Sequence, residues 1–259
     1  MTKFDRDLAQ YQWLFGNVFE DVLPDFLRTT GLYEPMKYAI RDGGKRLRPI
    51  VCLASAVAVG GKPEDALCPA MAIELLHSYT LIHDDLPAMD NDTERRGEPS
   101  VWAKFGEAQG ILAGDALQAL AFQVAACSPR NAAKIVGVLG EKGVGVVAGQ
   151  YEELQTSQTP LYVYLHKTAD LFVAAAKMGA LAGGGKHAEL VALEAYAVNL
   201  GLAFQFEDDL LDGDGLFAVN ETMRRVKEHT RAALAALKPL SGDTSFLAAL
   251  ARRLTKRTV

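Results

Sequence analysis

The sequence contains little cysteine. Its cysteines, Cys52, Cys68 and Cys127, are odd in number and far apart along the chain. Secreted disulfide scaffolds need many paired cysteines, and cysteine-ligated zinc sites need cysteines a few residues apart, so neither class fits this sequence. We expect the thiols to be reduced core residues of a cytoplasmic protein.

Long apolar runs and an excess of basic residues are also missing. The longest apolar runs, such as residues 49–59, are too short to span a bilayer, and acidic residues interrupt the N-terminal segment where a signal peptide would be apolar. The formal net charge of -5 and the pI near 5.6 argue against a general affinity for nucleic acid or anionic membranes. We therefore expect a soluble protein with no nucleic-acid partner and no stable membrane anchor, in which local cations or metal ions hold any anionic ligand.

Alternating strand patterns are scarce. Nearly every segment is rich in Ala, Leu, Met, Glu and Gln, with apolar residues at helical period. Glycine and proline signals divide the chain at residues 43–44, 60–63, 97–99, 128–129, 159–160, 183–185 and 213–215. The sequence predicts an all-α fold, a single-domain bundle of about ten or more helices over residues 1–259.

The first cluster of acids closes an apolar helical segment, residues 73–90. His77 and Asp84 are seven residues apart, which places them on one face of a helix. Pro87 should disturb that helix and bring Asp90 back toward its end. We expect Asp84, Asp85 and Asp90 to converge there.

The second cluster lies in residues 201–212. Gln205, Asp208, Asp209 and Asp212 follow the spacing i, i+3, i+4 and i+7, which makes one polar stripe on an apolar helix. Two carboxylates 4 Å apart repel by roughly 4 kcal/mol at an effective dielectric near 20, so several acids in one pocket need cations or protonation. Oxygen ligands without cysteine favour Mg²⁺, which commonly shares substrate phosphates. Acids on helices are usually a solvated face, but the apolar flanks of both clusters favour an inward orientation.

Basic residues accompany the first cluster in sequence. Residues 43–49, GGKRLRP, place Lys45, Arg46 and Arg48 at a helix start, which suits a diphosphate. Arg95 and Arg96 follow the first acids and would add two guanidinium groups. Each run can also be an exposed basic turn or helix end.

Taken together, these motifs resemble the short-chain trans-isoprenyl diphosphate synthases of the polyprenyl synthetase family, and most closely the bacterial farnesyl diphosphate synthases. The resemblance spans most of the chain in the family's order: GGKRLRP at 43–49, HDDLPAMDND at 83–92, RRG at 95–97, LAGDAL at 112–117, GQ at 149–150, KT at 167–168 and FQFEDDLLD at 204–212. It implies one polyprenyl synthetase domain whose helices surround a deep central cavity.

The resemblance also implies roles for individual residues. The residues that match magnesium ligands are Asp84, Asp85, Asp90, Asp208 and Asp212. They would bind three Mg²⁺ ions, or Mn²⁺, with the allylic diphosphate, which Arg95 would also hold. The residues that match the isopentenyl diphosphate site are Gly44, Lys45, Arg48, His77 and Arg96. The residues that match catalytic positions beside the allylic carbon are Lys167, Thr168 and Gln205.

The reaction implied is prenyl transfer. The metal ions act as Lewis acids on the leaving diphosphate of dimethylallyl or geranyl diphosphate, isopentenyl diphosphate attacks the allylic cation, and the departing pyrophosphate takes the proton. Tyr79 and Thr80, one turn before Asp84, would form the floor of the chain channel. Bulky Tyr79, with the extra residues Pro87 and Ala88, favours a farnesyl product, and geranylgeranyl diphosphate is the alternative. Family members are usually homodimers, which the apolar helices of residues 101–126 suit.

The sequence departs from the family in two loops. The segment after Asp212 lacks the family's basic loop, the stretch from Glu153 to His166 is short, and Glu153 replaces the usual aspartate. Either these loops are truly shortened, or residues are missing from the sequence there; we favour the second. Two other functions stay open: an all-α metal phosphohydrolase built on His83 and Asp84, and a non-catalytic regulatory subunit of a prenyltransferase.

Overall fold

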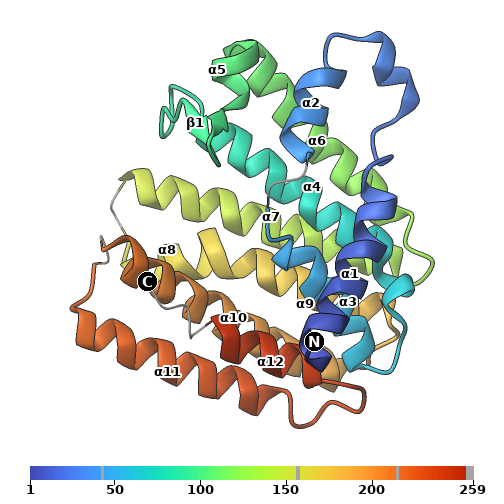
Figure 1. Cartoon of the computed structure of the whole chain (residues 1–259), viewed down its shortest axis with the longest axis vertical. Coiled ribbons are helices and arrows are strands. Elements are labelled where there is room, and N and C mark those ends of the chain that lie inside the picture. Colours follow the sequence, from blue (N-terminus) through green and yellow to red (C-terminus); the bar gives the residue numbers. More distant parts are fainter. Residues whose placement is uncertain (42–43, 156–157, 214–215, 255–259) are drawn as a thin grey trace.

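The protein is described from a computed structural model over residues 1–41, 44–155, 158–213 and 216–254. The predicted all-α fold is confirmed (Figure 1). In chain order the elements are α1 (Lys3–Phe19), η1 (Asp25–Thr29), α2 (Tyr33–Ile40), α3 (Leu47–Ala58), η2 (Pro63–Ala66), α4 (Leu67–Asp84), β1 (Glu94–Arg95), β2 (Glu98–Pro99), α5 (Val101–Phe105), α6 (Glu107–Ala126), α7 (Ala132–Gln155), α8 (Pro160–Val163), the π-helix η3 (Tyr164–Ala169), α9 (Asp170–Ala182), α10 (His187–Asp212), α11 (Val219–Ala236) and α12 (Ser245–Leu254).

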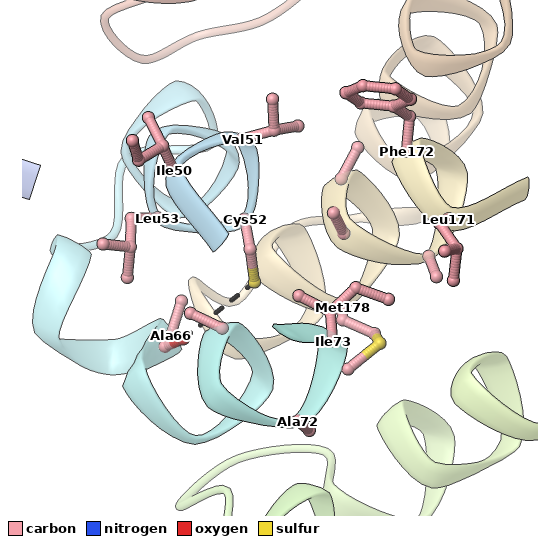
Figure 2. Close-up of a cluster of buried hydrophobic side chains, with 14 of the residues drawn as sticks. Ile50, Val51, Cys52, Leu53, Ala66, Ala72, Ile73, Leu171, Phe172 and Met178 are labelled. Atoms are coloured by element: carbon pink, nitrogen blue, oxygen red, sulfur yellow. Dashed lines mark hydrogen bonds between the residues drawn. The ribbon is translucent and has the colours of Figure 1, made fainter. Parts of the chain in front are cut away.

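The centre of the bundle is formed by α3, α4 and α9. Every residue of α9 except Lys177 is buried, as expected of a helix that is apolar all round. Figure 2 shows side chains of all three helices meeting, among them Cys52 of α3, Ile73 of α4 and Met178 of α9. Helices α3 and α9 approach closely at Gly179, where an added Cβ would lie 2.0 Å from the carbonyl oxygen of Cys52. Since α4 is one of these central helices and ends at Asp84, the packed centre fixes the position of the first acid cluster.

The three cysteines do not share one environment. Cys52 is fully buried in the core, as predicted, but Cys68 is half-buried and Cys127 is exposed. The prediction of a core position is therefore wrong for Cys127. This residue follows the last turn of α6, immediately before the Ser128–Pro129 turn, where the chain runs over the surface.

The two ends of the described chain lie together. Helix α1 packs beside α12 (Figure 1), and the ring of Phe4 stacks on that of Phe246 with centroids 4.8 Å apart. The Lys3 ammonium group lies 3.1 Å from the Asp243 carboxylate. In the described part of the chain, no helix combines the length and apolarity needed to cross a bilayer.

A short antiparallel hairpin, β1–β2, interrupts the helices after the first acid cluster. Its register pairs Glu94 with Pro99 and Arg95 with Glu98, which leaves a two-residue turn at Arg96 and Gly97. Both turn residues have positive φ, 56° and 78°, the backbone of a type I′ turn. The hairpin was not expected from the sequence, and it fixes the backbone positions of Arg95 and Arg96.

The two predicted loop departures include residues outside the part of the chain that the structure describes. Residues 156–157 and 214–215 lie outside the described residues, and the second pair includes Gly215, whose Cα distance to Leu216 would separate a true bond from a gap. Whether the loops are shortened or incomplete stays a prediction.

Candidate active site

The first acid cluster lies where α4 ends. Asp84 is the last helical residue, and the chain then turns so that the Asp90 amide donates to the Asp84 carbonyl oxygen at 2.9 Å. The Leu86 carbonyl closes this turn by accepting from Asn91, which has a φ of 55°. The expected return of Asp90 to the helix end is confirmed.

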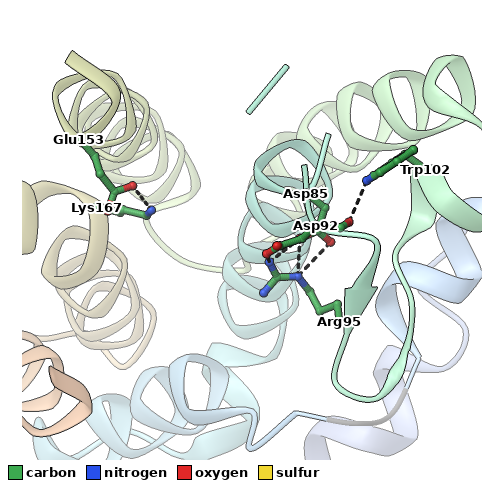
Figure 3. Close-up of polar contacts among 6 residues, drawn as sticks. All are labelled: Asp85, Asp92, Arg95, Trp102, Glu153 and Lys167. Carbon is green, nitrogen blue, oxygen red and sulfur yellow. Dashed lines mark hydrogen bonds and ion pairs between the residues drawn. The ribbon is translucent and has the colours of Figure 1, made fainter. Parts of the chain in front are cut away.

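The two adjacent aspartates at this helix end have different partners. Asp85 is buried, and its carboxylate accepts two hydrogen bonds from Arg95 Nε, at 2.7 and 2.9 Å, and another from Arg95 Nη2. Figure 3 shows Arg95 reaching back from the hairpin to Asp85, with Asp92 beside it. A metal ion at Asp85, as predicted, would have to share this carboxylate with Arg95. Asp84 is half-buried, and Asp90 is exposed.

Asp84 has a strongly shifted acidity. Burial raises the pKa of Asp84 to about 6; the Lys167 ammonium opposes this rise and the Asp90 carboxylate adds to it. In the absence of a ligand, the nearby positive charge therefore does not offset the cost of burying this carboxylate. A divalent cation at Asp84 would supply that charge and favour the carboxylate.

The second acid cluster is tied to the π-helix η3 by hydrogen bonds. The buried Asp209 carboxylate accepts from the Tyr164 hydroxyl at 2.7 Å and from Gln205 Nε2 at 3.0 Å. The Gln205 carbonyl oxygen in turn accepts from the Thr168 hydroxyl at 2.8 Å. Asp209 thus fixes which end of the Gln205 amide faces Thr168. Asp208 is half-buried on the same helix, and Asp212 is exposed.

The π-helix also presents Lys167. Its ammonium group forms an ion pair with Glu153 of α7 (Figure 3). The backbones come very close here, since a Cβ added at Gly149 would lie 2.4 Å from the Lys167 nitrogen. The glycine of the GQ motif therefore allows η3 to pack directly on α7, and any side chain there would displace Lys167 and Thr168.

Arg48 and His77 meet at the other side of the site. Arg48 Nη1 lies 3.2 Å from His77 Nε2. Burial and the neighbouring arginines, chiefly Arg48, hold the pKa of His77 well below its usual value, so the ring is neutral and Nε2 accepts from Arg48. Burial also lowers the pKa of Arg48 to about 10, while Glu74 and Asp208 act in the opposite direction. Arg48 Nε and His77 Nδ1 are buried without a hydrogen-bond partner among the described residues.

The remaining predicted cations divide into two groups. The Arg96 guanidinium lies over Gly44, where an added Cβ would be 2.9 Å from Nη2, so Gly44 and Arg96 are brought together. Lys45 is exposed at the same loop. Arg46 is different: its side chain is buried against Glu74, with which it forms an ion pair, and it is not available to a diphosphate as a third cation beside Lys45 and Arg48. The sequence had grouped all three, and for Arg46 that interpretation is wrong.

A protein-family model described as polyprenyl synthetase matches residues 29–224. This range is most of the chain and includes every residue of the candidate active site named above. The chain belongs to the polyprenyl synthetase family. The prediction of an all-α prenyltransferase is therefore confirmed. 

Relatives within the polyprenyl synthetase family carry names that differ in product. A geranylgeranyl diphosphate synthase of Cyanophora paradoxa is 41% identical over 80% of this chain and 74% of its own length. A chloroplastic geranylgeranyl pyrophosphate synthase of Capsicum annuum is 40% identical over 70% of this chain, which spans only 53% of that protein. The crystal structure of an FPP/GFPP synthase from Zymomonas mobilis superposes with a TM-score of 0.88 at 33% identity, covering 97% of this chain and 98% of that one.

The family's requirement for a divalent metal fits the donors present. Within the described ranges, no three His, Cys, Asp or Glu side chains are close enough together to form a complete metal site. The available donors are carboxylate oxygens, Asp84 with its raised pKa and half-buried Asp208 among them, and hard ions prefer such ligands. Mg²⁺ usually completes its octahedron with water and substrate phosphates, so an incomplete protein set suits it.

Three residues with clear positions in this site were missed by the sequence argument. Asp209 was counted in the stripe but given no role, and Tyr164 and Glu74 were not singled out. Only Asp209 left a signal, because it lies four residues after Gln205 and thus one helical turn away. The other two contacts join residues 45 and 28 positions apart.

Proposed function

We propose that this prenyltransferase condenses isopentenyl diphosphate with dimethylallyl and geranyl diphosphate to give farnesyl diphosphate. The observation that carries the proposal is the pairing of cations with half-buried acids: Lys167 acts on Asp84, and Arg48 on Asp208, although these residues come from four elements. An anionic, metal-loaded ligand placed among them would meet both signs of charge.

Each group of side chains has a defined task in this proposal. The unpaired Arg48 Nε and His77 Nδ1, with Gly44, Lys45 and Arg96, bind the diphosphate of isopentenyl diphosphate. Three Mg²⁺ ions held by the aspartates would supply Lewis acidity to the allylic diphosphate. Arg95 would hold the same diphosphate. The hydrogen-bonded Thr168–Gln205 pair and Lys167 would face the developing allylic cation, where oriented dipoles favour ionisation.

Product length is proposed to stop at fifteen carbons because of Tyr79. This side chain is buried, lies one turn below Asp84, and meets His83 edge to face with ring centroids 5.4 Å apart. A bulky ring at that depth would block further elongation. Tyr79→Ala should therefore shift the main product to twenty carbons or more. The relatives named for geranylgeranyl products make that twenty-carbon product the alternative for the unaltered chain.

Product analysis tests the proposed function directly. The purified chain is incubated with Mg²⁺, isopentenyl diphosphate and each allylic starter from five to fifteen carbons, and the dephosphorylated alcohols are separated. Farnesol as the main product supports the proposal, and dominant longer alcohols would show a geranylgeranyl synthase. Phosphate release without a new carbon–carbon bond would indicate a phosphohydrolase. Inactivity of the chain by itself would favour a regulatory subunit.

Metal dependence is tested separately. Activity should vanish with EDTA and return with Mg²⁺, and Mn²⁺ should substitute. Isothermal titration of Mg²⁺ with a non-hydrolysable allylic diphosphate analogue would count the ions, with three expected. Binding of metal without the analogue should be weak, because the donors present do not by themselves complete a site.

A homodimer is proposed from exposed apolar residues on α6 and α7. Those residues are Ile111, Leu112, Val144, Val147 and Tyr151, each 45% exposed or more. The two helices pack against each other, and an unpartnered apolar face of this kind favours association. Light scattering should show a dimer for the unaltered chain and a monomer for Leu112→Lys/Val144→Lys. Val191→Lys, an equally exposed apolar position on α10, is the control and should stay dimeric.

A further inference from the structure

Arg46 is the middle cation of the loop that enters α3, and its conformation is unusual. It precedes the first residue of α3 and has a φ of 48° and a ψ of 36°, the left-handed region that non-glycine residues rarely occupy. Its side chain is only 9% exposed. A strained backbone at a buried arginine persists only where the surroundings hold it.

The Arg46 guanidinium holds three groups at once. Nη1 donates to Glu74 Oε1 at 2.5 Å, and Nη2 donates to the carbonyl oxygens of Ile40 and Arg41 at 2.7 and 2.8 Å. Glu74 is 4% exposed and belongs to α4. The end of α2, the start of α3 and the middle of α4 are thereby joined at one planar group, which matches the fixed fork of an arginine.

This junction borders the predicted isopentenyl diphosphate site on two sides. Lys45 and Arg48 flank Arg46 in sequence, and Glu74 lies one turn before His77 on α4. Arg48 in turn contacts His77 at 3.2 Å. The position of the loop relative to His77 therefore depends on the contact between Arg46 and Glu74.

We propose that the Arg46–Glu74 ion pair positions the diphosphate-binding loop for isopentenyl diphosphate without touching the substrate. This inference rests on the proposed function. The pair sets Lys45, Gly44 and Arg48 against His77 and Arg96, so its loss should weaken binding of isopentenyl diphosphate and leave the allylic site, built on α10, η3 and the end of α4, largely intact.

Steady-state kinetics of the full chain test this with Arg46→Met, Glu74→Gln and the double variant. The KM for isopentenyl diphosphate should rise about tenfold in each single variant, as expected for losing a charged hydrogen bond. The KM for geranyl diphosphate should stay within about twofold. The double variant should be no worse than either single variant, because both remove the same contact. Arg46→Lys, a milder change, should give a smaller rise and serves if Arg46→Met does not fold.

A control is the Lys177–Glu194 ion pair, which is more exposed than the Arg46–Glu74 pair and joins α9 and α10 with a separation of 3.0 Å. Lys177→Met and Glu194→Gln should leave both KM values unchanged. Equal rises in the two KM values, an unchanged KM for isopentenyl diphosphate, or additive effects in the double variant would overturn the inference. Inactivity of the unaltered chain would instead overturn the proposed function, so the two failures are distinguishable.

Discussion

The pairs Asp84–Asp85 and Asp208–Asp209 are identical in sequence but are held by different chemistry. In each pair the first aspartate is half-buried and the second is buried and hydrogen-bonded within the protein. Asp85 is bound by the guanidinium of Arg95, whereas Asp209 accepts from the neutral Tyr164 hydroxyl and Gln205 amide. The second aspartate of each pair therefore orients a neighbouring functional group, whereas the first is the metal ligand that we propose. The pairs differ in whether that orientation depends on charge.

The largest expected effect tests the role of the first aspartates. Asp84→Asn and Asp208→Asn should each lower kcat by a hundredfold or more, since lost metal charge stabilisation amounts to about 3 kcal/mol or more. Steady-state assays at saturating Mg²⁺ provide the measurement. If either variant keeps more than a tenth of the activity, the two pairs do not share the proposed division of roles.

The next effect concerns stability of the metal-free chain. Because the folded-state pKa of Asp84, about 6, lies above its ordinary value of 3.8, the folded state favours the protonated form, and stability is lost as pH rises toward 6 and stays lost above it. Asp84→Asn should therefore raise the free energy of unfolding at pH 8 by up to about 3 kcal/mol, and by about half as much at pH 5.

Urea unfolding with EDTA at both pH values measures this difference between variant and unaltered chain. Asp90→Asn, at an exposed acid of the same turn, is the control and should change stability far less. A gain for Asp84→Asn that is equal at pH 5 and pH 8 would contradict the titration of Asp84 as its cause.

Substitutions of the second aspartates, Asp85 and Asp209, should lower kcat/KM to different extents because their hydrogen-bond partners differ. Asp85→Asn removes the buried carboxylate that holds Arg95, leaving only the longer contact of 3.7 Å to Asp92, and should cost about 2 kcal/mol in transition-state stabilisation. Asp209→Asn weakens hydrogen bonds from neutral donors and should cost about 1 kcal/mol. Comparison of kcat/KM for geranyl diphosphate gives both values. The Asp85 effect should diminish more than the Asp209 effect as salt rises, because the Arg95 guanidinium is partly exposed and salt screens its charge in part. If kcat/KM of the two variants depends equally on salt, the proposed difference between a charged partner at Asp85 and neutral partners at Asp209 is wrong.

The smallest expected effect comes from Tyr164→Phe. It removes one hydrogen bond to Asp209 while leaving the ring packed against Phe206, so unfolding should be easier by about 1 kcal/mol. The kcat should fall by about twofold, less than the roughly fivefold loss that corresponds to about 1 kcal/mol for Asp209→Asn, since Gln205 keeps its bond to Asp209. Tyr162→Phe, on the preceding turn, is the comparison and should have no such effect. A Tyr164 variant as impaired as Asp209→Asn would show that Tyr164, not Gln205, is the main support of the carboxylate.

Local rules predicted the helices and the turn at the first acid cluster because both depend on residues close in sequence. Glycine and proline placed the ends of α3, α6, α9 and α10 correctly, and Pro87 returned Asp90 to Asp84 as expected. Contacts across the fold were beyond such rules. Arg46 could not be separated from Lys45 by type or spacing, since only the approach of Glu74 from α4 distinguishes them.

The hairpin and the π-helix also escaped prediction for physical reasons. Two residues per strand give too little alternation to read, and positive φ at Arg96 is unusual for a side chain of that size. A π-helix has the composition of an α-helix and differs only in hydrogen-bond register. It lies in close contact with α7 at Gly149, and no local pattern reveals a contact between segments so far apart in sequence.

The π-helix η3 amounts to one extra residue in an otherwise continuous helical stretch from Pro160 to Ala182. A single deletion within Tyr164–Ala169 would remove that extra residue and restore a regular α-helix, in which a residue shifted by one position faces a direction about 100° away. Lys167 and Thr168 would then face away from Gln205 without any change in their identity. A one-residue deletion in this segment would therefore impair the enzyme although Lys167 and Thr168 are both retained. A comparison of residue types at the site would not detect the cause.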